Sequence, residues 1–154
     1  MPERKIYIVS GPIQTGKTTR LFEFVRTKTS VDGILAPVID NKRTLYHISS
    51  KQLKILEAEL AGEKTIHVGK YSFYKKTFNW ANKKLIESFY AKPEWLIIDE
   101  VGKLELKNEG LHSAINEILN YRNESETKII LVVREYLLEK VLEKYKIEKT
   151  EHIL

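Results

Sequence analysis

Residues 11–18 have the residue types and spacing of a phosphate-binding loop, because they read Gly-Pro-Ile-Gln-Thr-Gly-Lys-Thr and fit the pattern G-x-x-x-x-G-K-[ST]. The two glycines lack Cβ, so the backbone can wrap closely and turn successive N–H groups towards phosphate oxygens. In this pattern the lysine reaches the β- and γ-phosphates and the last hydroxyl can ligate Mg²⁺. The motif therefore predicts binding of a nucleoside triphosphate such as ATP or GTP, through Gly11, Pro12, Ile13, Gln14, Thr15, Gly16, Lys17, Thr18 and Thr19.

The residues around this loop predict the structural context that the motif needs. The apolar run at residues 5–10 indicates a strand, and a helical pattern extends from Thr18 to about Thr29, with Leu21 on its buried side. The helix N-terminus would add unpaired N–H groups and a partial positive charge beneath the phosphates.

A second group of candidates follows another apolar run, residues 95–98, which is typical of a strand buried on both faces. Asp99 directly follows this strand, which is the Walker B pattern, and its carboxylate is predicted to hold Mg²⁺ together with Thr18. Glu100 stands one residue further, where a carboxylate can orient and deprotonate a water molecule that attacks the γ-phosphate. The alternative is a structural ion pair between Glu100 and Lys103.

Arg134 directly follows a third apolar strand, residues 129–133. If that strand lies between the other two, Arg134 reaches the γ-phosphate and can neutralise charge in the transition state. The alternative is an ion pair with a neighbouring carboxylate such as Glu135. The predicted catalytic residues are therefore Glu100, Lys17 and Arg134.

Residues 33–48 are predicted to form a β-hairpin, with strands at about 34–39 and 43–48 around a turn at 40–42. Pro37 cannot donate a hydrogen bond to a neighbouring strand, so we expect this hairpin near a sheet edge.

The remaining elements alternate between strands and helices. Leu53, Leu56 and Leu60 have helical spacing, which leaves residues 50–64 ambiguous. Further elements are predicted as a short strand at 65–68, a helix at about 72–90 with Ser72 as N-cap, a helix through 111–119, a helix at 135–144 and a terminal strand at 151–154. This alternation predicts an α/β fold with a mostly parallel sheet.

Composition places the chain among soluble globular proteins, since 42% of its residues are hydrophobic and 31% are charged. We expect one domain over residues 1–154, working as a cytoplasmic monomer, with no apolar run of membrane-spanning length and no signal peptide before the first strand. The absence of cysteine excludes disulfides and thiolate zinc sites. The net charge of +5 permits a nucleic-acid partner, but no nucleic-acid-binding module accompanies it, and we do not expect one.

Residues 98–106, Ile-Asp-Glu-Val-Gly-Lys-Leu-Glu-Leu, resemble the D-E-[IV]-G-x-[ML]-E-L signature of a P-loop nucleoside-triphosphatase family, the thermophile-type or cancer-related nucleoside-triphosphatases. The resemblance covers most of the chain, because residues 11–19, 33–37 and 68–71 are also similar to segments of that family.

The resemblance implies a three-layer P-loop fold of the additional-strand type, in which the strand after the Walker B strand lies between the two Walker strands. It implies Mg²⁺-dependent hydrolysis of several nucleoside triphosphates to diphosphate and phosphate. Through the matching motifs, Lys17 is assigned to phosphate binding, Thr18 and Asp99 to metal binding, and Glu100 to water activation. The chain departs from the family at Gln14, where the loop usually has a second glycine.

Two other functions fit a phosphate loop. A small-molecule or nucleoside kinase is one, although the few arginines do not cluster in a lid-like segment. A nucleotide-dependent switch, with RNA as one conceivable partner, is the other. The mixed aromatic and basic segment 70–76 either begins an amphipathic helix or, through Tyr71, stacks on a base. The four histidines lack metal-ligand spacing.

Overall fold

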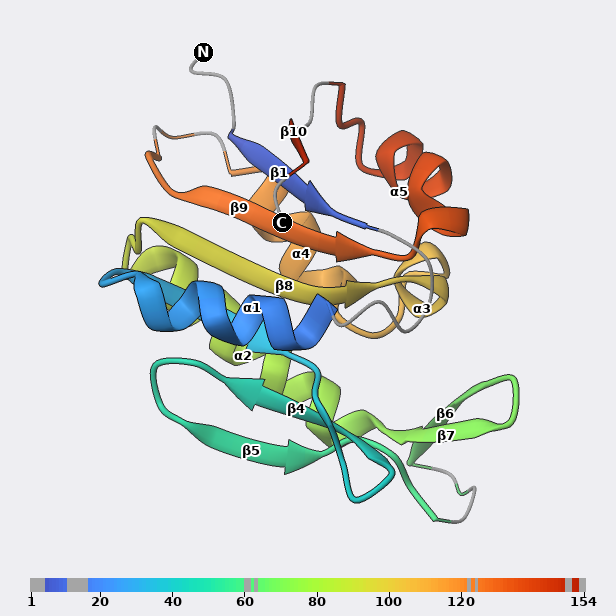
Figure 1. The fold of residues 1–154 in the computed structure, drawn as a ribbon. Coiled ribbons are helices and arrows are strands. Elements are labelled where there is room, and N and C mark those ends of the chain that lie inside the picture. The colour runs from blue at the N-terminus through green and yellow to red at the C-terminus, as the bar shows by residue number, and fades with distance from the viewer. Residues whose placement is uncertain are drawn as a thin grey trace.

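The computed structural model describes residues 5–10, 17–59, 62, 64–121, 123, 125–148 and 151–152, without the side chains at positions 17, 18, 151 and 152. In this part of the chain, an eight-stranded sheet forms the centre and a two-stranded hairpin lies beside it (Figure 1). The strands of the main sheet are β1 (Ile6–Val9), β2 (Val31–Leu35), β3 (Val38–Ile39), β4 (Lys42–His47), β5 (Gln52–Ile55), β8 (Trp95–Val101), β9 (Lys128–Val133) and β10 (Glu151–His152). The hairpin consists of β6 (Thr65–Val68) and β7 (Tyr71–Tyr74).

The order of the sheet is β10-β1-β9-β8-β2-β4-β3, and β5 pairs with β4. All pairings from β10 to β2 are parallel, whereas β4 runs antiparallel to β2. Because β9 lies between β1 and β8, the structure confirms the predicted additional-strand order. The carboxyl ends of β1, β9, β8 and β2 therefore meet at one edge of the sheet, where ligands of such folds bind.

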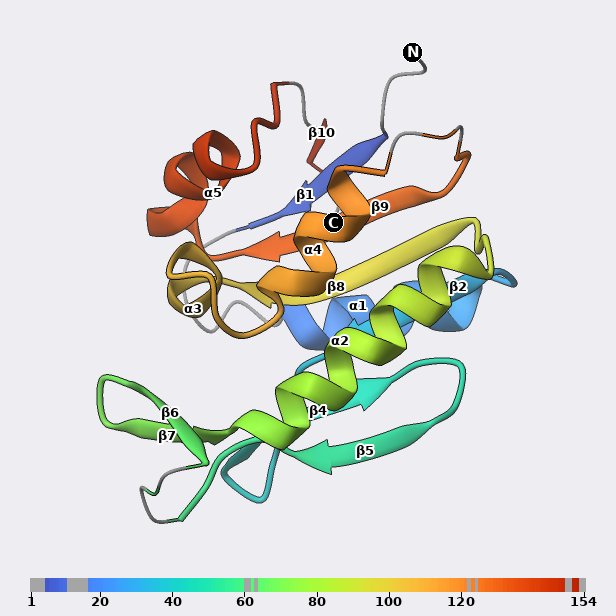
Figure 2. The same ribbon diagram turned by 180° about the vertical axis from the view of Figure 1, so that it is seen from behind.

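Helices cover both faces of the sheet, which completes the predicted three layers. The helices are α1 (Lys17–Thr27), α2 (Lys75–Tyr90), α3 (Lys103–Leu106), α4 (His112–Leu119) and α5 (Leu138–Lys144), with a 3-10 turn η1 (Glu135–Leu137) before α5. Helix α1 lies against one face, and α2 and α4 lie against the other (Figures 1 and 2). None of the helices within the described ranges is long and apolar enough to cross a membrane.

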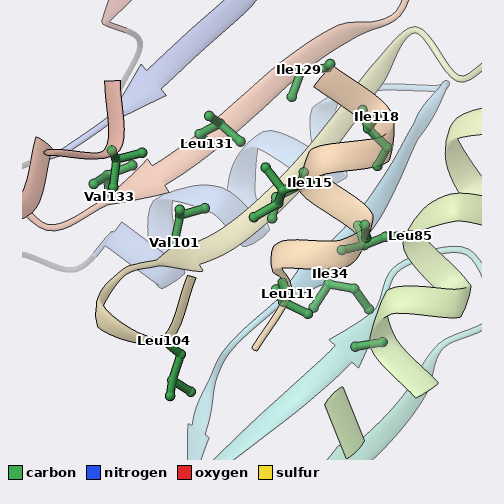
Figure 3. Close-up of a cluster of buried hydrophobic side chains, with 14 of the residues drawn as sticks. Ile34, Leu85, Val101, Leu104, Leu111, Ile115, Ile118, Ile129, Leu131 and Val133 are labelled. Atoms are coloured by element: carbon green, nitrogen blue, oxygen red, sulfur yellow. The ribbon is translucent and has the colours of Figure 1, made fainter. Parts of the chain in front are cut away.

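Strand β8 shows why the sequence contains uninterrupted apolar runs. Ile97 is buried on the α1 side together with Leu21, whereas Ile98 is buried on the α2 and α4 side, where Leu85 and Ile115 pack (Figure 3). Successive side chains of a strand point to opposite faces, so a strand between two helical layers needs apolar residues at every position.

Gly33 allows β2 to pair closely with β8. Its φ is +129°, and a Cβ atom at this position would meet the backbone of Ile97. A residue with a side chain would therefore push apart the two strands whose carboxyl ends frame the candidate site.

The predicted hairpin at 33–48 forms, but its first strand was placed incorrectly. Strand β2 begins at Val31, ends before Pro37 and is an interior strand of the sheet. Of the predicted hairpin, only the short β3 and the strand β4 lie towards the edge. Pro37 breaks the predicted strand because it has no N–H to donate.

The structure also decides one ambiguous segment and corrects one prediction of secondary structure. Within residues 50–64, which the sequence left ambiguous, residues 52–55 form the edge strand β5, so the helical spacing of Leu53 and Leu56 was coincidental. The second helix begins at Lys75 and not at Ser72, because residues 71–74 form β7. The hydroxyl of Ser72 lies 2.9 Å from Nδ1 of His67 across the hairpin and does not cap the helix.

Candidate functional site

The structure places candidates from β8 and β9 at the same edge of the sheet. Asp99 and Glu100 lie near the end of β8, and Arg134 directly follows β9. The predicted phosphate-loop residues 11–16 lie outside the described residues. Lys17 and Thr18 form the start of α1, but their side chains are not described, and Thr19 is exposed in its first turn.

Asp99 is held in a fixed orientation. It is only 1% exposed, and its Oδ2 accepts a hydrogen bond of 2.9 Å from the N–H of Ala36, just beyond the end of β2. The neighbouring strand thus fixes this carboxylate at the carboxyl edge of the sheet.

The residues present fit a magnesium ion bound together with phosphates. Among the described residues, no cluster of three or more His, Cys, Asp or Glu side chains could hold a metal ion alone. Mg²⁺ commonly retains several waters and takes one or two carboxylates together with phosphate oxygens. Asp99 offers one such hard oxygen donor, and the sequence offers the hydroxyl of Thr18.

Glu100 adopts an unusual backbone conformation. Its φ is +59°, and the register between β8 and β9 shifts between Ile98 and Val101. This irregularity leaves the Glu100 side chain 39% exposed, next to the buried Asp99. A positive φ outside glycine costs about 1–3 kcal/mol, and such strained residues concentrate at functional sites.

Two arginines contact the carboxylate of Glu100. Nη1 of Arg43 lies 2.9 Å from Oε2, and Nη2 of Arg134 lies 3.7 Å from Oε1. Within the described part of the chain, neither of the alternative ion pairs, from Glu100 to Lys103 or from Arg134 to Glu135, is formed. Two candidates chosen separately from the sequence are therefore in contact with each other.

Sequence reasoning missed Arg43. The residue lies near the start of β4, and the antiparallel pairing of β4 with β2 brings it to the edge where the parallel strands end. Its guanidinium also lies 5.1 Å from the ring centroid of Tyr71 on β7. Its position in the sequence could have indicated this place. Arg43 comes just after the turn at 40–42, and this turn returns the chain to the carboxyl end of β2.

Glu105 supports the loop that follows Glu100. It is 3% exposed, and its two carboxylate oxygens accept hydrogen bonds from the N–H groups of Gly102 (2.7 Å) and Leu111 (2.8 Å). Burial raises the pKa of Glu105 to about 7, against the opposing effect of these hydrogen bonds. Its partner Leu111 is preceded by Gly110, whose φ of +65° and close approach to Glu105 require glycine. The Gly-x-x-Glu spacing of residues 102–105 therefore has a structural explanation.

A cavity of about 230 Å³ lies beside Glu100. Charged lining residues include Arg43, Glu100 and Arg134. Most of the remaining lining is apolar and comes from β4, the β6–β7 hairpin, the first turn of α2, α3 and the η1 turn.

The weaker candidates have structural partners. Tyr71 belongs to the hairpin and not to a helix, and its ring stacks at 6.1 Å on that of Phe73. His47 lies 3.3 Å from Asp32, and Nδ1 of His112 lies 2.7 Å from the hydroxyl of Tyr145. Burial opposes the ionisation of Asp32, but hydrogen bonds from His47, Gly33 and nearby serines hold the pKa of Asp32 well below its usual range.

The chain is similar to known proteins in sequence and in fold. The profile of a family described as NTPase matches residues 6–154. The nucleoside-triphosphatase THEP1 of Sulfolobus acidocaldarius is 33% identical over 124 residues, which cover 75% of this chain and 70% of that protein. The crystal structure of THEP1 from the hyperthermophile Aquifex aeolicus superimposes with a TM-score of 0.75 at 18% identity, over 96% of this chain and 88% of that one. The last comparison supports the fold alone.

Proposed function

The chain belongs to the NTPase family, and from this premise we propose that it is a Mg²⁺-dependent nucleoside-triphosphate phosphohydrolase that accepts several bases. One observation carries most of the weight: the carboxylate of Glu100 and the guanidinium of Arg134 are 3.7 Å apart at the ends of neighbouring strands. Strand β9 separates β8 from β1, the strand that leads into the predicted phosphate loop. A γ-phosphate bound by that loop would lie within reach of both side chains.

In this proposal Lys17 and the backbone of residues 11–19 bind the triphosphate. Bound Mg²⁺, held by Asp99 and Thr18, would supply positive charge to the β- and γ-phosphates. Glu100 orients a water molecule in line with the bond that breaks and accepts its proton. The water oxygen bonds to the γ-phosphorus as the bond to the bridging oxygen breaks, which releases nucleoside diphosphate and phosphate.

Arg134 is assigned the neutralisation of charge in the transition state. In the structure it contacts Glu100 at 3.7 Å, a distance at which the pair is weak, so that a phosphate oxygen can compete for the guanidinium. Arg43 lies closer to Glu100, and we assign it to positioning that carboxylate. The broad base tolerance, the single domain and a monomeric cytoplasmic state stay predictions from the sequence.

The experiment that tests this function measures phosphate release from ATP, GTP, CTP and UTP, with Mg²⁺ and with EDTA. We expect turnover of all four nucleotides with Mg²⁺, none with EDTA, and none in Lys17→Ala. Tight binding of nucleotide with negligible release of phosphate would contradict the proposal and favour a nucleotide-dependent switch.

A further inference from the structure

The cavity beside Glu100 is larger and more apolar than a water nucleophile requires. Its volume is about 230 Å³, and Leu45, Leu56, Phe78 and Leu111 contribute to its wall. A water molecule takes up about 30 Å³ of liquid and needs polar partners. Such a wall instead suits the ring system of a small organic molecule.

The position of the cavity separates it from the strand that leads into the phosphate loop. Its wall comes from β4, the β6–β7 hairpin, α2, α3 and the η1 turn, with Arg134 just after β9, and includes no residue of β1. Figures 1 and 2 both show the β6–β7 hairpin projecting beside β4, well away from β1. A triphosphate bound next to β1 and a molecule in the cavity would therefore meet at Glu100 and Arg134.

Aromatic and basic groups along the lining indicate the chemistry of an occupant. Tyr71 and Phe73 both line the cavity with nearly parallel rings, at an interplanar angle of 6°, and such an aromatic wall suits a planar heterocycle. Lys70 also lines the cavity and adds positive charge, which a phosphorylated product would neutralise, whereas Arg43 is already paired with Glu100. Although arginines do not cluster in the sequence, Arg43 and Arg134 meet at Glu100 in the fold.

We propose that this cavity binds a nucleoside as a phosphoryl acceptor, so that the protein transfers the γ-phosphoryl group to a sugar hydroxyl as well as to water. The hydroxyl oxygen bonds to the γ-phosphorus, the bond from this phosphorus to the bridging oxygen breaks, and Glu100 accepts the hydroxyl proton. The products are a nucleoside monophosphate and a nucleoside diphosphate. The inference rests on the proposed function for the donor triphosphate.

The test incubates the wild-type protein with γ-labelled ATP, Mg²⁺ and adenosine, cytidine, guanosine or thymidine in separate reactions. Thin-layer chromatography separates labelled nucleoside monophosphate from labelled phosphate. We expect label in the monophosphate for at least one nucleoside, with a matching fall in free phosphate. Label in free phosphate alone with all four nucleosides overturns the acceptor proposal but supports hydrolysis, whereas label that stays entirely in ATP overturns the proposed function itself.

A pair of variants ties this activity to the cavity. Val68 lines the cavity, and the neighbouring His67 is exposed on the opposite face of the same hairpin. In Val68→Trp the indole fills the cavity, and we expect the ratio of monophosphate to free phosphate to fall at least tenfold. His67→Trp should retain the wild-type ratio. An unchanged ratio in Val68→Trp would place the acceptor elsewhere and overturn the proposal.

Discussion

The carboxylate of Glu100 forms an ion pair of 2.9 Å with the guanidinium of Arg43, a residue from the antiparallel strand β4. Arg134 contacts the other carboxylate oxygen from the end of β9. Glu100 is thus held between side chains of two strands on opposite sides of β8. These two contacts fix a partly exposed carboxylate where the proposed reaction needs it.

Arg43→Ala should lower kcat about tenfold and leave KM for ATP nearly unchanged. The variant loses the orientation of Glu100 but keeps every predicted contact to the phosphates. Arg43→Lys should recover part of the rate, since it keeps the charge but loses the planar fork of the guanidinium. Steady-state phosphate release measures both. A wild-type kcat in Arg43→Ala would show that this ion pair has no role in positioning.

Arg134→Ala is expected to lower kcat more severely, by about 10³-fold, because an arginine that stabilises the transferring phosphoryl group contributes about 10³–10⁵ in rate. Arg26, exposed in the last turn of α1, provides a matched control, and Arg26→Ala should retain wild-type kcat. If Arg134→Ala behaves like the control, Arg134 serves only as a structural partner of Glu100.

Gly110→Ala should destabilise the fold by about 2 kcal/mol or more. The residue has a φ of +65°, and a Cβ atom there would collide with the carboxylate of Glu105. Gly62→Ala is the control, because a Cβ at Gly62 meets no atom of the described residues within 4 Å. Urea unfolding gives both free energies, and equal stability of the two variants would contradict the proposed support of the loop by Glu105.

The raised pKa of Glu105 predicts that the free energy of unfolding depends on pH. Its pKa is about 7 in the folded state and near the ordinary 4.5 when unfolded, so between these values the folded protein binds more protons. The free energy of unfolding should therefore fall as pH rises from about 4.5 to about 7, by about 3 kcal/mol in total.

The neutral variant Glu105→Gln isolates this effect, because other groups titrate in the same range. His112, for example, has a pKa lowered by burial, and its contribution to stability has the opposite dependence on pH. Urea unfolding gives the free energy of unfolding of wild type and variant at several pH values. The value for wild type minus the value for the variant should fall as pH rises. A difference that does not depend on pH would rule out titration of Glu105 in this window.

The parts of the site that lie next to apolar runs could be predicted from sequence. Asp99 and Glu100 lie near the end of β8 and Arg134 follows β9, and the apolar runs of these two buried strands produce a strong local signal. The position of β9 between β1 and β8 came instead from the family resemblance, because local patterns do not determine strand order.

Arg43 and the hairpin could not be predicted in the same way. The partnership of Arg43 with Glu100 depends on the pairing of β4 with β2, which is a long-range contact. In residues 71–74, Tyr71 and Phe73 alternate as in a strand, but the segment adjoins a helix and was assigned to it. In β5, Leu53 and Ile55 are exposed on an edge strand. Because this segment has no buried face, no requirement for a sustained two-residue alternation of apolar and polar residues marked it as a strand.

In the proposed mechanism Glu100 activates the attacking water at a nucleotide site next to β1. Single-turnover phosphate release from ATP in Glu100→Gln, together with the Kd of a non-hydrolysable ATP analogue, tests this role most directly. Glu109 is exposed between α3 and α4, and Glu109→Gln serves as control. We predict a rate about 10²–10⁴ times slower than wild type with a Kd within a few-fold of wild type, and no change in the control. A wild-type rate in Glu100→Gln, or a loss of rate explained entirely by weaker binding, would contradict the assignment.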